Sequence, residues 1–323
     1  MTSQQIEYVL TLAEEKSFSK ASQKLYVTQP SLSQFIKNLE NELCIQLFDR
    51  STSPIRLTPA GIAFIDAARR IKGIEEELNH QITDLSNLKI GDLRIGTSPF
   101  RASCLLPKSI AEFHKIYPGV TIHILEDKMS DLEKAALEGC IDLYLGTGPF
   151  DNNLFHAENL AEEQFYLAVP SDCPINIDLE AFQVSNLDIK RDTVKLNKTP
   201  PVNLSLFQSQ QFIIQKQGQK LYPLELEFCH DAGFDPDVIL YSERLETAFS
   251  WALAGIGVTF LPDFLIRFGN YAKHPVYYKL GHEKASRHLC IAYRKNRYLS
   301  RVSIEYIVVL KRLIGYGTWQ FKE

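Results

Sequence analysis

Polar side chains that could bind another molecule gather first near the N-terminus of this 323-residue chain. Gln29, Ser33 and Lys37 follow one another at intervals of four residues, so a helix would align them on one face, flanked by Pro30 and Gln34. Glutamine can form two hydrogen bonds with an adenine edge, and serine can reach either bases or phosphates. Lysine suits a phosphate, where counterion release supplies much of the affinity. These residue types at this spacing predict a face that binds nucleic acid.

The elements that would position this face are predicted to be short helices joined by tight turns. Apolar residues recur at helical spacing over residues 6–13, and a second short helix follows. Thr28 is predicted to cap the third helix, with Pro30 tolerated in its first turn. Residues 47–50 and 55–58 then predict two short strands that form a small wing. The buried side of the third helix is predicted to carry Leu32, Phe35, Ile36, Leu39 and Leu43.

Basic and acidic residues are unevenly distributed along this region. The whole chain has a formal charge of -4 and a pI of about 6.1, so bulk charge does not attract nucleic acid. Residues 1–60 contain six basic and six acidic residues, yet residues 16–39 hold four lysines and no acid. This uneven distribution favours a local DNA-binding surface. For each of these residues taken singly, the alternative is a polar helix face that is exposed to solvent and binds nothing.

A long helix is predicted to follow over residues 59–89. Its apolar positions step by three and four, which is a heptad pattern over about three and a half heptads. A helix of this length would extend roughly 40 Å and would need a partner for its apolar seam. We expect a helix pair between two chains, with packing on the same chain as the alternative. The seam consists of Phe64, Ala67, Ile71, Ile74, Leu78, Gln81, Leu85 and Leu88.

From Gly91 onward, strands alternate with helices, which implies largely parallel sheets. About 230 residues with nine strands suit two small α/β lobes, with a ligand-binding cleft between them as the default site. The segment 180–201 shows no clear periodicity and is predicted to be an elaborated loop. The expected strands are residues 92–96, 121–125, 141–145, 165–169, 212–214, 238–241, 258–261, 276–280 and 289–293. The expected helices include residues 105–116, 130–138, 221–232 and 245–254.

The first 60 residues resemble the winged helix-turn-helix of the LysR-type transcriptional regulators. The matching segments are FSKAS at 18–22, VTQPSLS at 27–33, IKNLE at 36–40, LFDR at 47–50 and LTPAG at 57–61. Further matches are LRIG at 93–96, LP at 106–107, YP at 117–118, EGCID at 138–142, AGIGV at 254–258 and LP at 261–262. The resemblance therefore extends over almost the whole chain and is weakest in residues 298–323.

The resemblance implies an α/β fold with a winged helix-turn-helix head, a long linker helix and a two-lobed effector domain similar to periplasmic binding proteins. The implied domains are residues 1–60 for DNA binding, 61–89 for coiled-coil dimerisation and 90–323 for effector binding. Lobe I would comprise about 90–164 and 265–323, and lobe II about 165–264. A bacterial, cytoplasmic dimer or tetramer would bind pseudo-palindromic promoter DNA, with half-sites roughly 34 Å apart. A small-molecule effector and RNA polymerase are the other implied partners.

Site residues follow from the matched positions. The DNA-binding residues would be Ser19, Lys20, Thr28, Gln29, Pro30, Ser31, Ser33, Gln34, Lys37, Arg50 and Arg56. The effector-binding residues would be Thr97, Ser98, Pro99, Phe100, Arg101, Met129, Ser130, Thr147, Gly148, Gln215, Lys216 and Gln217. The dimerisation residues would be Phe64, Ile71, Ile74, Leu78, Leu85 and Leu88. Arg101, with Lys216 and Lys220 opposite it, favours an anionic effector such as a carboxylate.

Three other classes of protein are weighed against this hypothesis. The sequence lacks a P-loop and an HExxH motif, and Gly146-Thr147-Gly148 lacks the third glycine of a dinucleotide cradle, so we expect neither an enzyme nor a cofactor or metal. A redox sensor would have to use Cys173 and Cys229, which lie far apart in the sequence. The six cysteines form no CxxC pair, as is typical of a reducing compartment. A two-lobed binding protein without a DNA function is opposed by the absence of a signal peptide, and no apolar run suggests a membrane span.

Overall fold

A computed structural model describes residues 2–51, 54–85, 91–269 and 271–314 of the chain. Its internal contacts divide the chain into two units. The first comprises residues 1–87 with 134–141, and the second comprises residues 88–133 with 142–323. In the described part of the chain, no helix is both long and apolar enough to cross a bilayer.

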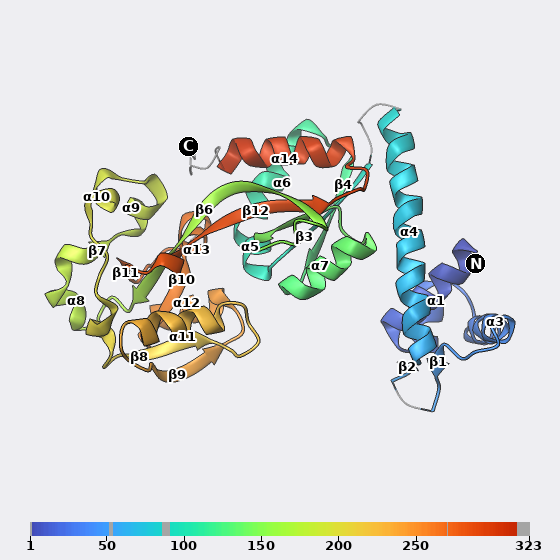
Figure 1. The fold of residues 1–323 in the computed structure, drawn as a ribbon, viewed down its shortest axis with the longest axis horizontal. Coiled ribbons are helices and arrows are strands. Elements are labelled where there is room, and N and C mark those ends of the chain that lie inside the picture. The colour runs from blue at the N-terminus through green and yellow to red at the C-terminus, as the bar shows by residue number, and fades with distance from the viewer. Residues whose placement is uncertain (1, 52–53, 86–90, 270, 315–323) are drawn as a thin grey trace. The chain divides into compact units, whose positions relative to one another are not determined.

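The first unit begins with a winged helix-turn-helix, as predicted, and ends in a long helix (Figure 1). Its elements are α1 (Ser3–Glu15), α2 (Phe18–Lys24), α3 (Gln29–Glu42), β1 (Phe48–Asp49), β2 (Arg56–Leu57) and α4 (Pro59–Leu85). The two strands pair antiparallel as the wing. The apolar sides of the helices meet in one core, which consists of Val9, Leu12, Ala21, Leu32, Ile36, Leu39, Leu47, Phe48 and Ile65.

Local sequence signals explain where these helices start. The side chains of Ser17 and Thr28 accept hydrogen bonds from backbone N–H groups in the first turns of α2 and α3, so each acts as an N-cap. Pro30 lies in the first turn of α3, where its missing N–H costs nothing. The turn between α2 and α3 contains Tyr26 in the left-handed region, with φ of 54°.

The second unit is built on a ten-stranded mixed sheet. Eight strands follow the order β4-β3-β5-β12-β6-β10-β8-β9, β11 pairs with β6, and β7 pairs with β11. Its strands are β3 (Gly91–Thr97), β4 (Val120–Glu126), β5 (Leu143–Thr147), β6 (Phe155–Val169), β7 (Gln183–Val184), β8 (Gln211–Gln215), β9 (Asp237–Ser242), β10 (Val258–Pro262), β11 (Val276–Lys279) and β12 (Ser286–Arg294). β3, β4 and β5 run parallel to one another, and so do β8, β9 and β10.

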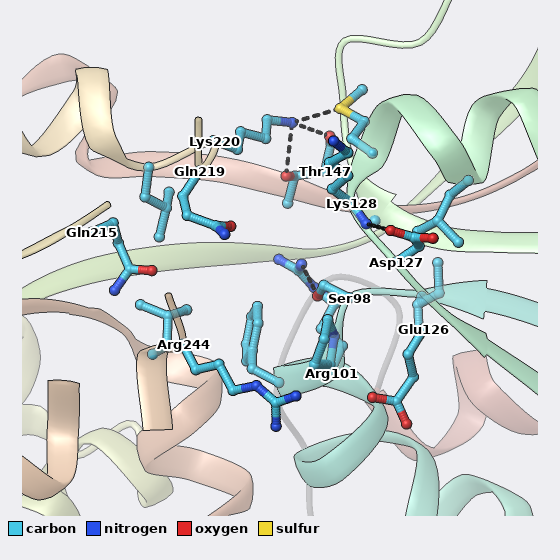
Figure 2. Close-up of a pocket in the computed structure, with 18 of the residues that line it drawn as sticks. Ser98, Arg101, Glu126, Asp127, Lys128, Thr147, Gln215, Gln219, Lys220 and Arg244 are labelled. Atoms are coloured by element: carbon cyan, nitrogen blue, oxygen red, sulfur yellow. Dashed lines mark hydrogen bonds between the residues drawn. The ribbon is translucent and has the colours of Figure 1, made fainter. Parts of the chain in front are cut away.

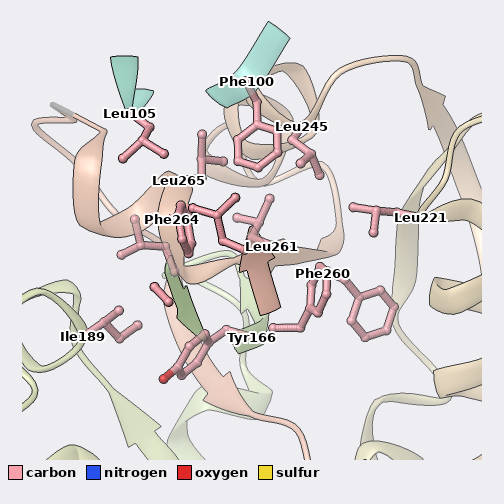
Figure 3. Close-up of a cluster of buried hydrophobic side chains, with 14 of the residues drawn as sticks. Phe100, Leu105, Tyr166, Ile189, Leu221, Leu245, Phe260, Leu261, Phe264 and Leu265 are labelled. Carbon is pink, nitrogen blue, oxygen red and sulfur yellow. The ribbon is translucent and has the colours of Figure 1, made fainter. Parts of the chain in front are cut away.

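Helices cover this sheet and connect its strands. They are α5 (Pro99–Cys104), α6 (Leu106–Ile116), α7 (Met129–Glu138), α8 (Ile175–Asp178), α9 (Asn186–Arg191), α10 (Val194–Lys198), α11 (Tyr222–Asp231), α12 (Leu245–Leu253), α13 (Asp263–Phe268) and α14 (Arg301–Ile314). Of α7, only residues 129–133 belong to the second unit, and its last five residues are grouped with the first. Short 3-10 turns occupy η1 (Glu180–Phe182), η2 (Leu204–Phe207) and η3 (Glu283–Ala285). Phe100 of α5 and Leu105, which directly follows α5, lie in the same buried cluster as Leu245 of α12 and Leu265 of α13 (Figure 3).

One strand joins the two halves of the sheet. β6 is 15 residues long and pairs with β12 along its first part and with β10 and β11 along its last part. The sequence predicted a strand only over residues 165–169, because residues 156–164 are mostly polar. These polar residues belong to the strand because each pairs with a residue of β12. As a result, β6 begins ten residues earlier than predicted.

The segment 180–201 is not a loop, and that prediction was wrong. It contains η1, β7, α9 and α10. Val184, Ile189 and Leu196 are 2%, 0% and 5% exposed, so the segment contributes to the core. Its elements have two to six residues each, and such short pieces are too brief to show a hydrophobic period in the sequence.

Candidate functional site

The exposed side of α3 presents the polar residues that the sequence placed there. Gln29, Pro30, Gln34 and Lys37 are exposed and Ser33 is half-buried. The Thr28 hydroxyl accepts the N–H of Ser31 at 3.3 Å, which fixes the start of the helix. Such a helix end offers side chains and free N–H groups to a groove or a phosphate.

Two further contacts hold this region in shape. Ser19 Oγ donates to Gln29 Oε1 at 3.2 Å and so connects α2 with the first residue of α3. Glu40, which is 7% exposed, accepts the backbone N–H groups of Leu47 and Phe48 at 2.9 and 3.1 Å. The same carboxylate therefore anchors the wing to the last turns of α3.

Arg50 is engaged within the protein. Its Nη2 lies 2.6 Å from Glu40 Oε2, and its guanidinium stands over the Phe18 ring at 5.3 Å. The Arg50 side chain is 37% exposed, so one side remains open to solvent. Lys20, Ser31 and Arg56 are exposed, and no ion pair of Lys20 or Arg56 is seen among the described residues.

Tyr26 belongs to the same surface, although the sequence analysis did not select it. It is 95% exposed in the turn before α3. A fully exposed tyrosine in a left-handed turn is unusual, because an aromatic side chain commonly covers some apolar surface. Its hydroxyl could donate to a phosphate. The positive φ that marks it is not visible in the sequence.

The predicted dimerisation residues of α4 fall into two groups. Phe64 is half-buried and packs against the core of the helix-turn-helix. Ile71, Ile74 and Leu78 are 42%, 67% and 55% exposed, and Ile82 continues this apolar stripe at 56%. The side chain of Leu85 and all of Leu88 lie outside the described residues.

A cavity of about 360 Å³ lies in the second unit at the carboxyl ends of parallel strands (Figure 2). Ser98, Glu126 and Thr147 come from the ends of β3, β4 and β5, while Gln215 ends β8 and Arg244 follows β9. This is where an open α/β sheet places ligands. Apolar walls are supplied by Phe100, Leu132, Tyr144, Leu145, Leu221 and Leu245.

Two arginines of the cavity lining, Arg101 and Arg287, share one buried carboxylate, that of Glu163. Arg101 Nη2 donates to both carboxylate oxygens of Glu163, at 3.0 and 3.1 Å, and Nη1 donates to Ser98 at 3.1 Å. Arg287 Nε donates to the same carboxylate. Burial opposes the charge on Glu163, but Arg101 and Arg287 outweigh it and hold the pKa of Glu163 below its usual value. Within this group two cations share one anion, while the carboxylates of Glu126, Asp127, Glu243 and Glu246 line other parts of the same cavity.

Lys220 brings a third cation to the cavity. Its Nζ donates to the carbonyl oxygens of Thr147 and Gly148 at 2.6 and 2.8 Å. Partial burial, together with the charges of Arg287 and Arg101, lowers the pKa of Lys220 to about 8. Positive charge is therefore concentrated where Lys220, Arg101 and Arg287 influence one another, and this part of the cavity favours an anionic group.

The structure brings together seven of the twelve predicted effector-binding residues. The cavity is lined by Ser98, Pro99, Phe100, Arg101, Met129, Thr147 and Gln215. Thr97 donates its hydroxyl to Leu145 O and faces the neighbouring strand. The other predicted residues outside the lining are Ser130, Gly148, Lys216 and Gln217.

Other charged residues of the cavity escaped the sequence analysis. Arg287 and its partner Glu163 come from β12 and β6, and Arg244 and Glu246 from the start of α12. Arg101 itself lies in helix α5 and is 5% exposed. The strand predicted over residues 289–293 begins two residues after Arg287, so no signal in the sequence pointed to this partner; β12 in the structure runs over Ser286–Arg294 and includes it.

A cluster of possible metal ligands, Glu227, Asp231 and His282, also lies in the described part of the second unit. His282 Nδ1 accepts the N–H of Lys284 at 3.1 Å, and Nε2 faces Asp231 at 2.9 Å. A metal on Nε2 would require the proton on Nδ1, where the Lys284 N–H points. Glu227 is engaged by the Lys284 ammonium. This arrangement suits hydrogen bonds better than a metal.

The six cysteines, all of them among the described residues, form no disulfide. Burial raises the pKa of Cys229 and of Cys104 to about 12 in each case, which disfavours the reactive thiolate. Cys173 Sγ lies 3.2 Å from Gln210 Oε1.

A winged helix-turn-helix with an exposed polar helix, together with a separate α/β unit that contains a charged cavity, defines the class of DNA-binding transcriptional regulators. Comparison with known proteins gives the family. The profile of the bacterial regulatory helix-turn-helix protein, lysR family, matches residues 3–62, and the profile of the LysR substrate binding domain matches residues 86–312. The chain belongs to the LysR family of transcriptional regulators, and so is a regulator and not an enzyme.

Relatives in this family cover nearly the whole chain. The HTH-type transcriptional regulator YcgK of Bacillus subtilis (strain 168) is 31% identical over 296 residues, which is 91% of this chain and 89% of the relative. The transcriptional regulator AlsR of the same organism is 28% identical over 298 residues, 91% of this chain and 90% of the relative.

Solved structures share the fold over their full lengths. Full-length OxyR from Pseudomonas aeruginosa aligns with a TM-score of 0.68 at 24% identity and covers 100% of this chain and 98% of that chain. The LysR family regulator CbnR aligns with a TM-score of 0.64 at 17% identity and covers 97% and 99%. At these identities the structures support the fold alone.

Proposed function

We propose that this regulator acts in the bacterial cytoplasm, binds pseudo-palindromic promoter DNA through α3, and responds to an anionic small molecule in the cavity of its second unit. The observation that carries the proposal is the exposed face of α3, which presents Gln29, Gln34 and Lys37 from a helix capped by Thr28. A complex of the related regulator CbnR with its target DNA supports the same role. RNA polymerase would be the further partner of such a regulator.

The domain division follows the same proposal. Residues 1–60 bind DNA, residues 61–89 form a helix that pairs with a second chain, and residues 90–323 bind the effector, with lobe I at about 90–164 and 265–323 and lobe II at about 165–264. The apolar stripe of Ile71, Ile74 and Leu78 supports the helix pair, because exposed aliphatic side chains at this spacing gain stability from a partner. Two chains, or four, would then present paired recognition helices to half-sites about one helical turn apart.

The effector would bias an equilibrium between two shapes of the assembly. A ligand can shift such an equilibrium only by its difference in affinity for the two states. The cavity is suited to this because its walls come from both halves of the sheet, so a ligand that contacts Arg101 and Gln215 together favours one separation of the halves.

Selection from a random double-stranded DNA library tests the DNA-binding part. We expect the full chain to enrich a pseudo-palindrome. The combined replacements Gln29→Ala, Ser33→Ala and Lys37→Ala should abolish this enrichment, since each good base contact contributes about 1–3 kcal/mol.

A matched control uses the same residue types on the second unit. Lys198→Ala, Gln208→Ala and Ser209→Ala remove exposed side chains there and should leave DNA binding intact. If the α3 variant still binds the selected sequence with native affinity, α3 is not the recognition helix.

A further inference from the structure

One buried carboxylate on α3 holds both the start of the wing and an arginine. Glu40 Oε1 accepts the backbone N–H groups of Leu47 and Phe48 at 2.9 and 3.1 Å. Its second oxygen, Oε2, accepts a hydrogen bond from Arg50 Nη2 at 2.6 Å. Hydrogen bonds to a charged acceptor are strong, so these three donors fix the orientation of the Glu40 carboxylate and one corner of the Arg50 guanidinium.

A second contact restrains the same guanidinium. Arg50 Cζ lies 5.3 Å from the centre of the Phe18 ring, and Phe18 itself packs against the core of the helix-turn-helix. The face of an aromatic ring attracts a cation. Because Glu40 holds Nη2 and Phe18 lies against the guanidinium, the Arg50 side chain has little freedom to rotate.

Most of the hydrogen-bonding capacity of Arg50 nevertheless remains available. A guanidinium has several N–H donors in a planar fork, and in the described part of the chain only Nη2 has an acceptor. The side chain is 37% exposed, so another molecule can reach it. A planar fork of donors matches the oxygens of a phosphate.

Arg50 and the first residue of α3 contact neighbouring residues. Phe18 and Ser19 begin α2. Arg50 lies over Phe18, and Ser19 Oγ donates to Gln29 Oε1 at 3.2 Å. A DNA groove that receives Gln29 is bordered by phosphate backbones, and Arg50 is placed to meet one of them.

Resting on the proposed function, we propose that Glu40 and Phe18 are positioning residues that hold the Arg50 guanidinium ready for a DNA phosphate. A free arginine side chain loses rotamer freedom when it binds, whereas Arg50 has already lost most of it in the folded chain. The negative charge of Glu40 opposes the phosphate little, because three donors share this buried carboxylate. A contact with the backbone supports binding to all sequences alike.

The test measures binding of the full chain to a duplex of random sequence by fluorescence anisotropy at a series of salt concentrations. We expect Arg50→Met to bind about 10-fold more weakly. The slope of log K against log salt should become shallower by about 0.9, which is the value for one phosphate contact. Arg50→Lys keeps the charge and loses the planar fork, so it should keep the slope and still lose affinity.

The positioning role of Glu40 is tested against a matched control. Glu40→Gln keeps an oxygen for the two backbone N–H groups and removes the charged partner of Arg50. Glu42→Gln removes the same charge from an exposed position of α3. We expect Glu40→Gln to bind the duplex about 3- to 10-fold more weakly than Glu42→Gln, because the freed arginine must be ordered on binding. In chains that also carry Arg50→Met the two variants should bind equally, since Glu40 acts through Arg50.

A second variant tests the other restraint. Phe18→Leu keeps an apolar side chain against the core and removes the ring face, so it should weaken binding only when Arg50 is present. This comparison decides the question if Glu40→Gln does not fold, as urea unfolding of each variant would show.

Several results would overturn the inference. If Arg50→Met leaves both affinity and salt slope unchanged, Arg50 binds no phosphate, although the DNA-binding role stands. If Glu40→Gln binds as tightly as Glu42→Gln, or remains weaker when Arg50→Met is also present, Glu40 serves the fold alone. If the native chain binds no duplex even at low salt, the proposed DNA-binding role itself fails.

Discussion

Lys220 and Thr147 are joined across the ligand cavity although 73 residues separate them in the sequence. The Lys220 ammonium donates to the Thr147 carbonyl oxygen at 2.6 Å and lies 3.2 Å from the Thr147 hydroxyl (Figure 2). Lys220 precedes α11 and Thr147 ends β5, so this contact connects loops from the two halves of the sheet. A ligand carboxylate would compete with these carbonyl groups for the ammonium.

Removal of this ammonium should loosen the cavity mouth. We expect Lys220→Met to speed hydrogen exchange at residues 147–150 and 216–221, because the contacts to Thr147 and Gly148 are lost. Lys216→Met is the matched control, since Lys216 lies in the same loop but pairs with the exposed Glu243. Equal exchange in the two variants would mean that the Lys220 contact does not hold the loops.

Binding of a carboxylate should weaken as the pH rises through about 8. The pKa of Lys220 is lowered to about 8, so its positive charge is present below this pH and is lost above it. A bound carboxylate favours the protonated form, so binding near pH 8 takes up a proton. Calorimetry with the tightest-binding member of a panel of small carboxylates, in buffers of different ionisation enthalpy, measures this uptake. In Lys220→Met the step near pH 8 should be absent, and its persistence would assign the titration to another group.

Glu163→Gln should destabilise the second unit by about 3–5 kcal/mol, because it leaves the buried guanidinium groups of Arg101 and Arg287 without their carboxylate. Urea unfolding followed by circular dichroism measures the loss. Glu162→Gln, one residue away on the exposed side of β6, is the control and should change stability little. Equal stability of the two variants would show that Glu163 is not what offsets these charges.

The exposed stripe of α4 should control assembly. Ile74→Glu places a charge at a position that is 67% exposed in the single chain, so it costs little there but opposes burial against a second helix. We expect sedimentation velocity to show a smaller species than the native chain at the same concentration. Lys72→Glu changes the charge at an exposed position outside the seam and should leave assembly unchanged. A native-sized Ile74→Glu species would exclude this stripe from the interface.

Tyr26→Phe should weaken DNA binding uniformly across sequences. Tyr26 is 95% exposed beside the start of α3, and a hydroxyl bonded to a phosphate contributes about 1.5–3 kcal/mol. Fluorescence anisotropy with selected and scrambled duplexes measures both affinities. Tyr241→Phe, at an exposed position of β9, is the control. A loss confined to the selected duplex would instead make Tyr26 a base contact.

Local sequence signals predicted the DNA-binding part well. The cap at Thr28, the proline in the first helical turn and the apolar spacing of α3 involve residues that are close together in the sequence. They can therefore be recognised from the sequence alone. The order of strands and helices in the second unit was also predictable, because alternating segments imply parallel sheets. The short elements between residues 180 and 198 were not, since each depends on packing against distant residues.

The sequence by itself indicated the family, the helix that we propose to recognise DNA and the general place of the cavity, because motifs and hydrophobic periods are properties of neighbouring residues. Only the tertiary structure decided the charge of the cavity. Arg101 and Glu163 are 62 residues apart, and the register of β6 with β12 places Arg287 directly opposite Glu163. Which charges meet in a buried wall depends on that register, and a shift of one residue would turn these side chains to the other face of the sheet.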